Sequence, residues 1–157
     1  MRVGCGQRRE RRCVRAANAS GVVGFTYSYG GSSAYSYYSY AVAADGNGGY
    51  TFTYTTGEYD DYGEMTCAVG DDVLSGLQAI YDECGLAAWN GYNKYNSNVL
   101  DGYGFSVSFT FADGGTMYAQ GSNSSPQGYR MFVDKMQELL SPLADDLCEQ
   151  ARQEHIG

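Results

Sequence analysis

The chain has 157 residues, of which 43% are hydrophobic, so its length and composition fit one folded domain and exclude bulk disorder. The formal net charge is −8, but six of the ten basic residues lie within residues 1–15, beside a single acidic one. The remainder is strongly acidic and should repel polyanions, so we expect neither a nucleic-acid partner nor a membrane partner.

Residues 1–20 form an arm rich in arginine, and their composition differs sharply from the Tyr, Ser and Thr residues that follow. The arm carries too little apolar surface to order itself, so we expect it to be disordered or foreign to the natural sequence. A single folded domain is then predicted over residues 21–157. No apolar stretch follows the charged start, and this lack of a secretory signal favours a cytoplasmic location.

Four strands are predicted in the first half of the domain. Aromatic residues that alternate with small polar ones predict strands over 22–29 and 34–44, with a Gly-Gly-Ser-Ser turn between them. The loop Asp-Gly-Asn-Gly-Gly at 45–49 predicts a hairpin to a third strand over 50–56. An acidic loop follows, and a shorter fourth strand is predicted over 64–69.

The period of the hydrophobic pattern then changes from two residues to that of a helix. It predicts a helix over 71–85, where a glycine ends it, and a long connection over 86–102. The segment 103–111 alternates Tyr, Phe and Val with Gly, Ser and Thr, and predicts a strand that pairs with 116–121. A second helix is predicted over 125–150, with a proline near its start and a later proline that should kink or restart it.

The element order β-β-β-β-α-β-β-α, joined by sequential hairpins, predicts an α+β fold. We expect a mostly antiparallel sheet of about six strands, with the two helices packed on one face.

Several short segments carry a resemblance. They are Trp-Asn-Gly-Tyr at 89–92, Val-Leu-Asp-Gly-Tyr-Gly-Phe-Ser at 99–106, Asp-Gly at 113–114 and Pro-Gln-Gly-Tyr at 126–129, together with the Tyr-Ser-Tyr segments near the start of the domain. In these segments the chain resembles a family of uncharacterised proteins from gut Gram-positive bacteria, over roughly residues 22–141. The resemblance implies a bacterial protein of similar domain limits and brings no activity with it.

Familiar catalytic and metal-binding patterns are missing from the sequence. The only histidine, His155, stands two residues from the C-terminus and no GxSxG motif occurs, so a nucleophile paired with a histidine base is nearly excluded. Five cysteines without a CxxC pair argue against a disulfide framework and a zinc site, and their odd number also favours the cytoplasm; a Cys67–Cys84 disulfide stays open. We expect no cofactor and no metal site.

The acidic loop 58–64 supplies the one catalytic alternative. Two carboxylates in unlike environments could act as acid and base in a small hydrolase or lyase, and several carboxylates could hold calcium weakly. A solvated acidic loop is the simpler interpretation. The residues concerned are Glu58, Asp60, Asp61 and Glu64.

Two aromatic features point instead to a non-catalytic binding or interaction module. Trp89, Asn90 and Tyr92 could hold a polar ligand or sugar, although a Trp89 that packs against the core is the interpretation we favour. Tyr38 and Tyr40 share one side of the second strand, and we expect them on the sheet face that the helices leave open. The partner would be an unknown protein or a polar small ligand, and the open sheet face could also pair two copies as a homodimer.

Overall fold

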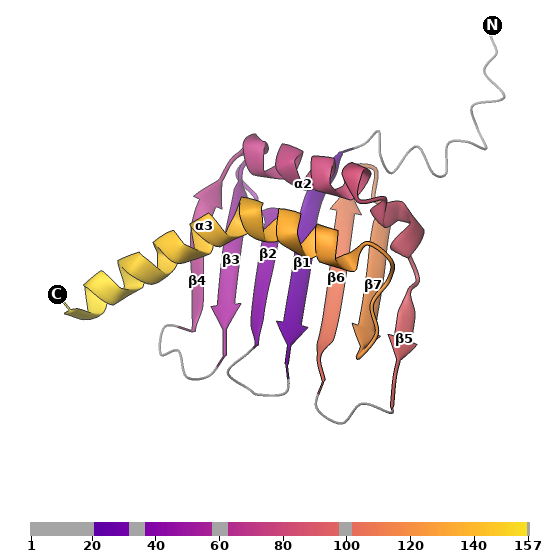
Figure 1. The fold of residues 1–157 in the computed structure, drawn as a ribbon. Helices are drawn as coiled ribbons and strands as arrows, with labels where there is room; N and C mark the ends of the chain where they lie inside the picture. The colour runs from indigo at the N-terminus through magenta and orange to yellow at the C-terminus, as the bar shows by residue number, and fades with distance from the viewer. Residues whose placement is uncertain (1–20, 32–36, 58–62, 98–101, 157) are drawn as a thin grey trace, which may run out of the picture.

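A computed structural model describes residues 21–31, 37–57, 63–97 and 102–156, so the predicted arm 1–20 lies outside the described residues. One sheet of seven strands forms one layer, and helices α2 and α3 cover the same face of it (Figure 1). The predicted α+β fold with a mostly antiparallel sheet is confirmed, with seven strands in place of about six. The elements are β1 (Val22–Gly30), β2 (Tyr38–Ala44), β3 (Tyr50–Thr56), β4 (Glu64–Val69), α2 (Asp71–Glu83), the 3-10 helix η2 (Leu86–Trp89), β5 (Asn93–Tyr95), β6 (Gly104–Phe111), β7 (Thr116–Ser122) and α3 (Tyr129–Ile156).

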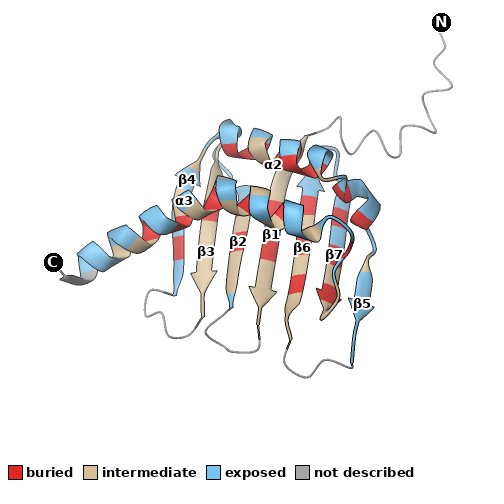
Figure 2. Cartoon of the chain, viewed as in Figure 1, coloured by how far each residue is buried: buried red, intermediate tan, exposed pale blue. Residues whose placement is uncertain are grey.

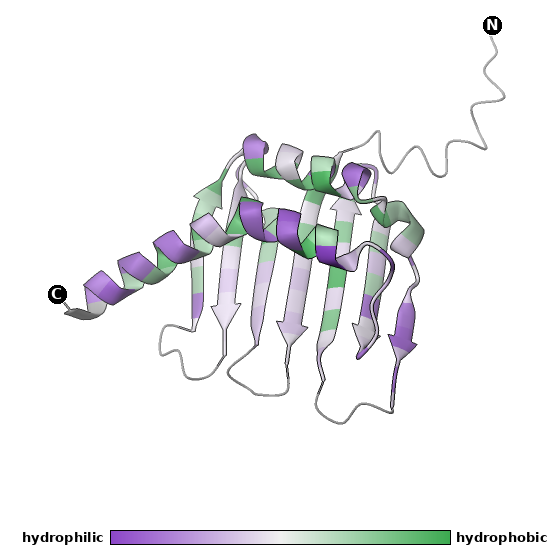
Figure 3. Ribbon diagram, in the orientation of Figure 1, coloured by the Kyte–Doolittle hydropathy of each residue, from purple (hydrophilic) through white to green (hydrophobic). Residues whose placement is uncertain are grey.

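The strand order is β4-β3-β2-β1-β6-β7-β5. The first four strands form an antiparallel meander, and α2 carries the chain back across the sheet so that β6 pairs antiparallel with β1. Only β5 is parallel to its neighbour, β7. The sequence analysis missed β5 because all three of its residues are exposed, which leaves no alternation to detect (Figure 3 shows it as a hydrophilic strand at the sheet edge).

The register between β1 and β6 separates the two faces of the sheet. Phe25 lies opposite Phe109, and Tyr27 lies opposite Val107, so large side chains gather on the side of the helices. The alternate positions carry small polar residues, and the hydroxyls of Thr26 and Ser108 lie within hydrogen-bond distance at 2.6 Å. We call this second side the open sheet face; it is composed of Thr, Ser, Ala and Gly along β1, β2, β3 and β6.

The core lies between the apolar sheet face and the two helices (Figure 2). Tyr81 of α2 packs edge-on against Phe109 and Phe111, with ring centroids 5.1 and 5.0 Å apart. Edge-to-face pairs of this kind add about 0.5–1.5 kcal/mol beyond the burial of their area. From α3, buried side chains recur every three or four residues, as one helical stripe requires: Phe132, Met136, Leu140, Ala144 and Leu147.

The ends of the helices follow the sequence in part. Gly85 has a left-handed φ of 65° just beyond α2, as a glycine that ends a helix should. The second helix begins later than predicted, at Tyr129, because Gly128 just before it has a left-handed φ of 87° that no right-handed helix contains. It then continues through Pro142 without a restart.

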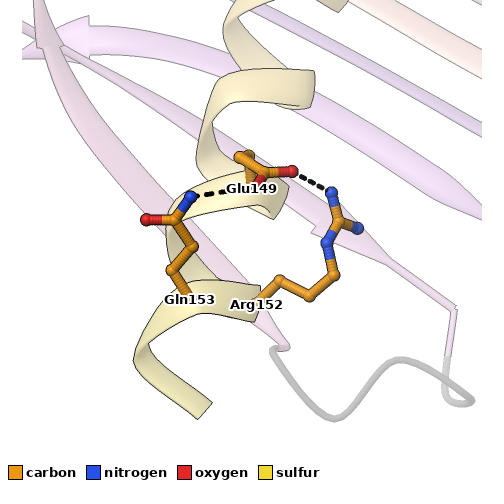
Figure 4. A network of polar contacts seen from close by, with 3 residues as sticks. All are labelled: Glu149, Arg152 and Gln153. Carbon is orange, nitrogen blue, oxygen red and sulfur yellow. Dashed lines mark hydrogen bonds and ion pairs between the residues drawn. The ribbon is translucent and has the colours of Figure 1, made fainter. Parts of the chain in front are cut away.

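The last turns of α3 extend past β4, beyond the edge of the sheet (Figure 1). There Glu149 accepts hydrogen bonds from Arg152 and Gln153, which lie three and four residues further along the helix (Figure 4). The bond from Arg152 is the main cause that lowers the pKa of Glu149. Within the part of the chain that the structure describes, no helix is long and apolar enough to cross a membrane.

Two neighbouring substitutions on β6 test which side chains face the helices and which lie on the open sheet face. Phe109→Ala should lower the free energy of unfolding by about 3–5 kcal/mol, because Phe109 is fully buried and its loss leaves a cavity. Thr110→Ala, which changes the open sheet face, should stay within about 0.5 kcal/mol. Urea unfolding measures both, and similar losses for the two variants would contradict the assignment.

Candidate functional site

A pocket of about 630 Å³ opens where β1 ends and β2 begins, beside the first turns of α3. The two helices cross the upper part of the sheet in Figure 1 and leave this lower end uncovered. We call it the tyrosine pocket, because five tyrosines from four segments of the chain line it. Its lining residues are Tyr27, Tyr29, Tyr38, Tyr103, Ser125, Pro126, Gly128, Tyr129, Arg130, Val133 and Asp134.

Strand pairing brings these tyrosines together. Tyr27 and Tyr29 lie on one side of β1 by the two-residue period, and Tyr38 of β2 stands directly opposite Tyr29. The rings of Tyr29 and Tyr38 are 5.7 Å apart between centroids, and Tyr103 stacks on Tyr29 at 5.9 Å with an interplanar angle of 22°. Burial decreases along β1 as it leaves the helices: Tyr27 is 1% exposed, whereas Tyr29 is half-buried.

Hydrogen bonds connect the tyrosine hydroxyls to α3. Tyr27 Oη and Tyr129 Oη share a hydrogen bond of 2.5 Å. About two turns further along α3, Gln137 Oε1 accepts a hydrogen bond from Tyr40 Oη at 2.6 Å, and Gln137 Nε2 donates one to Tyr38 Oη at 2.8 Å. A single glutamine thus satisfies two phenols of β2, which removes much of the cost of covering them.

The phenols beneath α3 are held neutral. Burial is the largest cause that raises the pKa of Tyr27, Tyr40 and Tyr129 above its ordinary value of about 10. The hydrogen bond to Tyr129 raises the pKa of Tyr27 further. At neutral pH these groups are therefore hydroxyls that donate and accept hydrogen bonds, and they lack the charge of a phenolate base.

One pair of oppositely charged side chains lies at the rim of the tyrosine pocket. Arg130 Nε lies 3.8 Å from Asp134 Oδ1, and both side chains are largely exposed. Such a pair contributes about 0.2–1 kcal/mol at most, so the Arg130 guanidinium can exchange this partner for another at little cost.

Trp89 has the packing role that the sequence favoured. Its side chain is 4% exposed, its indole Nε1 donates to Gln127 O at 3.1 Å, and its ring meets Phe132 edge-on at 5.4 Å. Trp89 is therefore buried, and a ligand-binding role of Trp89 with Asn90 and Tyr92 stays a prediction. Asn90 and Tyr92 are also engaged in the fold: Asn90 Oδ1 accepts from the backbone of Tyr118 at 3.0 Å, and Tyr92 Oη lies 2.6 Å from Ser124 Oγ.

Tyr38 and Tyr40 do not stand on the open sheet face, and that expectation is wrong. Tyr40 is 3% exposed beneath α3, and Tyr38 lies on the same side, where it lines the tyrosine pocket. Tyrosines occur on both sides of the 34–44 segment, so the period alone did not say which set the helices would cover. On the open sheet face β2 presents Ser39, Ala41 and Ala43. The predicted homodimer through this face stays a prediction.

The acidic loop contributes little that can be placed. Of its four carboxylates only Glu64 lies within the described residues, and it is exposed at the start of β4. Among the residues that the structure describes, no group of three or more His, Cys, Asp and Glu side chains could hold a metal ion. Cys67 and Cys84 are free thiols, so the disulfide left open by the sequence is not formed.

The residues that sequence reasoning missed are Tyr27, Tyr29, Tyr103, Tyr129 and Arg130. One signal was present, since Tyr27 and Tyr29 continue the apolar side of their strand to its end. The first turn of α3 could be added only once the helix was placed over the sheet. No protein-family model matches the chain, and no curated protein matches its sequence, so the resemblance to gut bacterial proteins stays a prediction.

The buried phenols predict a fall in stability at alkaline pH. A pKa that is raised in the folded state means that the folded chain keeps protons which the unfolded chain releases above about pH 10. The contribution of these phenols to the free energy of unfolding should therefore be complete below about pH 10 and decrease above it. For Tyr27 the decrease should reach up to about 1.4 kcal/mol per pH unit.

Urea unfolding at a series of pH values measures this decrease. Tyr40→Phe removes one buried phenol with a raised pKa and should make the decrease shallower. A free energy of unfolding that stays constant above pH 10 would contradict the assignment of these hydroxyls to the core.

Proposed function

We propose that this protein is a non-catalytic binding module that holds a small ligand in the tyrosine pocket. The observation that carries the proposal is the convergence of five tyrosines, from β1, β2, the segment before β6 and the start of α3, on one pocket. Its volume of about 630 Å³ lies in the range of small-molecule sites. Tyrosine suits such a site because it offers a rigid ring and a hydroxyl at low entropic cost.

The chemistry of the lining supports binding more than catalysis. A general base or nucleophile needs a group that is charged or easily charged at neutral pH, and the raised pKa of Tyr27 and Tyr129 removes their phenols from that role. Asp134 is the single carboxylate in the lining, and it is exposed beside Arg130. The hydrolase or lyase alternative, which relies on the loop 58–64, gains no support from this pocket.

The pocket wall is also anchored, which favours binding. Tyr129 contacts Phe105 at 4.6 Å between ring centroids and shares its hydroxyl bond with Tyr27, so α3 fixes this side of the pocket against two strands. A wall held in place before the ligand arrives loses less entropy on binding than a mobile one.

Blocking the pocket tests the proposal. Val133 lines the pocket on α3, and Val133→Phe should fill part of its volume and weaken any small ligand by at least about tenfold through the clash. Met131→Phe places the same ring at an exposed position of the same helix and should leave the affinity unchanged. A library of small ring compounds, screened by ligand-observed NMR, supplies the probes.

Trp89 supplies a second readout. Its ring lies 6.2 Å from that of Tyr129, and it is the chain's only tryptophan, so occupation of the pocket should change its fluorescence. Failure of every compound to bind, or equal binding to both variants, would refute the proposal.

A further inference from the structure

The hydroxyls in the wall of the tyrosine pocket have more hydrogens than the hydrogen bonds between them use. Three hydroxyls of its wall, those of Tyr27, Tyr38 and Tyr129, carry three hydrogens. Tyr27 and Tyr129 share a hydrogen bond of 2.5 Å, and Tyr38 Oη accepts a hydrogen bond from Gln137 Nε2 at 2.8 Å. The shared bond uses one of the three hydrogens, and a bond between Tyr27 and Tyr38 would use at most one more. At least one hydrogen therefore remains, whichever hydroxyl donates.

The amide of Gln137 does not take up this remaining hydrogen. Its Nε2 already donates to Tyr38 Oη, and its Oε1 accepts from Tyr40. The hydrogen is therefore left on Tyr27, Tyr38 or Tyr129, and all three of these side chains line the pocket. The wall thus offers a donor to whatever occupies the pocket, and an oxygen acceptor is the group that satisfies it.

Two features of α3 add positive potential at the same place. The helix is 28 residues long and begins at Tyr129, so the positive end of its dipole lies beside the pocket. The guanidinium of Arg130 lines the pocket as well, and its only ion pair among the described residues is the 3.8 Å contact with the exposed Asp134.

A cation is the competing ligand, because tyrosine faces attract ammonium groups and the chain's net charge is −8. Charges within a few ångströms outweigh distant ones at physiological salt, where the screening length is about 8 Å. Near the pocket the charges of Arg130 and Asp134 largely offset each other, and the donor hydroxyl and the start of α3 then disfavour a cation.

We propose that the ligand of the tyrosine pocket is a small carboxylate on a ring-sized apolar body, with its oxygens toward the hydroxyls of Tyr38 and Tyr129 and toward Arg130, and its body against the rings of Tyr29 and Tyr103. This inference rests on the proposed function of the pocket and adds the chemical class of its ligand. The rings supply apolar area, and Arg130 supplies a fork of donors that matches a carboxylate.

Three probes of one shape separate the classes: benzoate, the neutral benzamide and the cation benzylammonium. Isothermal titration and Trp89 fluorescence measure their affinities for the full chain. We expect benzoate to bind at least about tenfold more tightly than benzylammonium, with benzamide between them. Tighter binding of benzylammonium or of benzamide would refute the proposal that the ligand is a carboxylate, but it would still support the proposed binding function of the pocket. Loss of all binding, from these probes and from the wider compound library alike, would refute the proposed function itself.

Variants locate the recognition on named groups. Tyr129→Phe removes a hydroxyl of the chain and should weaken benzoate by about tenfold. Arg130→Gln should weaken benzoate by about threefold and leave benzamide unchanged, because only the carboxylate uses the charge. Arg152→Gln is the matched control, since Arg152 lies near the C-terminal end of α3, and it should change neither affinity. If Tyr129→Phe does not fold, as circular dichroism would report, Arg130→Gln still decides, and an equal loss for both probes would overturn the inference.

Discussion

The packing of α3 across the apolar sheet face is the interaction on which the rest of the structure depends. Phe132, Met136 and Leu140 are fully buried between this helix and the strands, and burial of each such side chain contributes about 1.5–3 kcal/mol. The same helix supplies Tyr129 to the pocket and Gln137 to the phenols of β2. The core and the candidate site therefore share one element, and a change that shifts α3 over the sheet alters both together.

Tyrosine is concentrated where this cover ends. Beneath α2 and α3 the sheet carries Phe25, Phe52 and Phe109, whose rings have no polar atom to satisfy. Towards the uncovered end the same positions of the strands change to Tyr29, Tyr38 and Tyr54, which are only partly buried. A phenol can place its ring against the core and its hydroxyl against water, so it suits this boundary. The boundary composition is also what makes the pocket both apolar and able to form hydrogen bonds.

The sequence predicts the positions of the strands and helices better than it predicts which face of each strand the helices cover. The alternation over 103–111 determines β6 and its apolar face without ambiguity, because only one side carries large residues, and the burial of Trp89 also followed from the need of a long connection for an anchor. Tyr38 and Tyr40 were placed on the wrong face, since aromatic residues on both sides of their segment make the period symmetric. β5 left no signal, and the pocket required the position of α3, which is set by tertiary packing that no local pattern contains.

Pro142 interrupts the backbone hydrogen bonds of α3 near the middle of the helix. A proline has no backbone N–H, so the ladder of hydrogen bonds along the helix lacks one rung in its middle. On the N-terminal side fully buried side chains hold the helix to the sheet. Beyond Leu147 only the half-buried Cys148 and Ala151, among the described side chains, still pack against the core. Fraying that starts at the exposed end must pull Leu147 and Ala144 out of the core before it reaches Gln137 and Tyr129. Backbone amides after residue 147 should exchange with solvent in small local openings, while those before Pro142 exchange only when the whole domain unfolds. The helix can lose its last turns and keep the pocket intact.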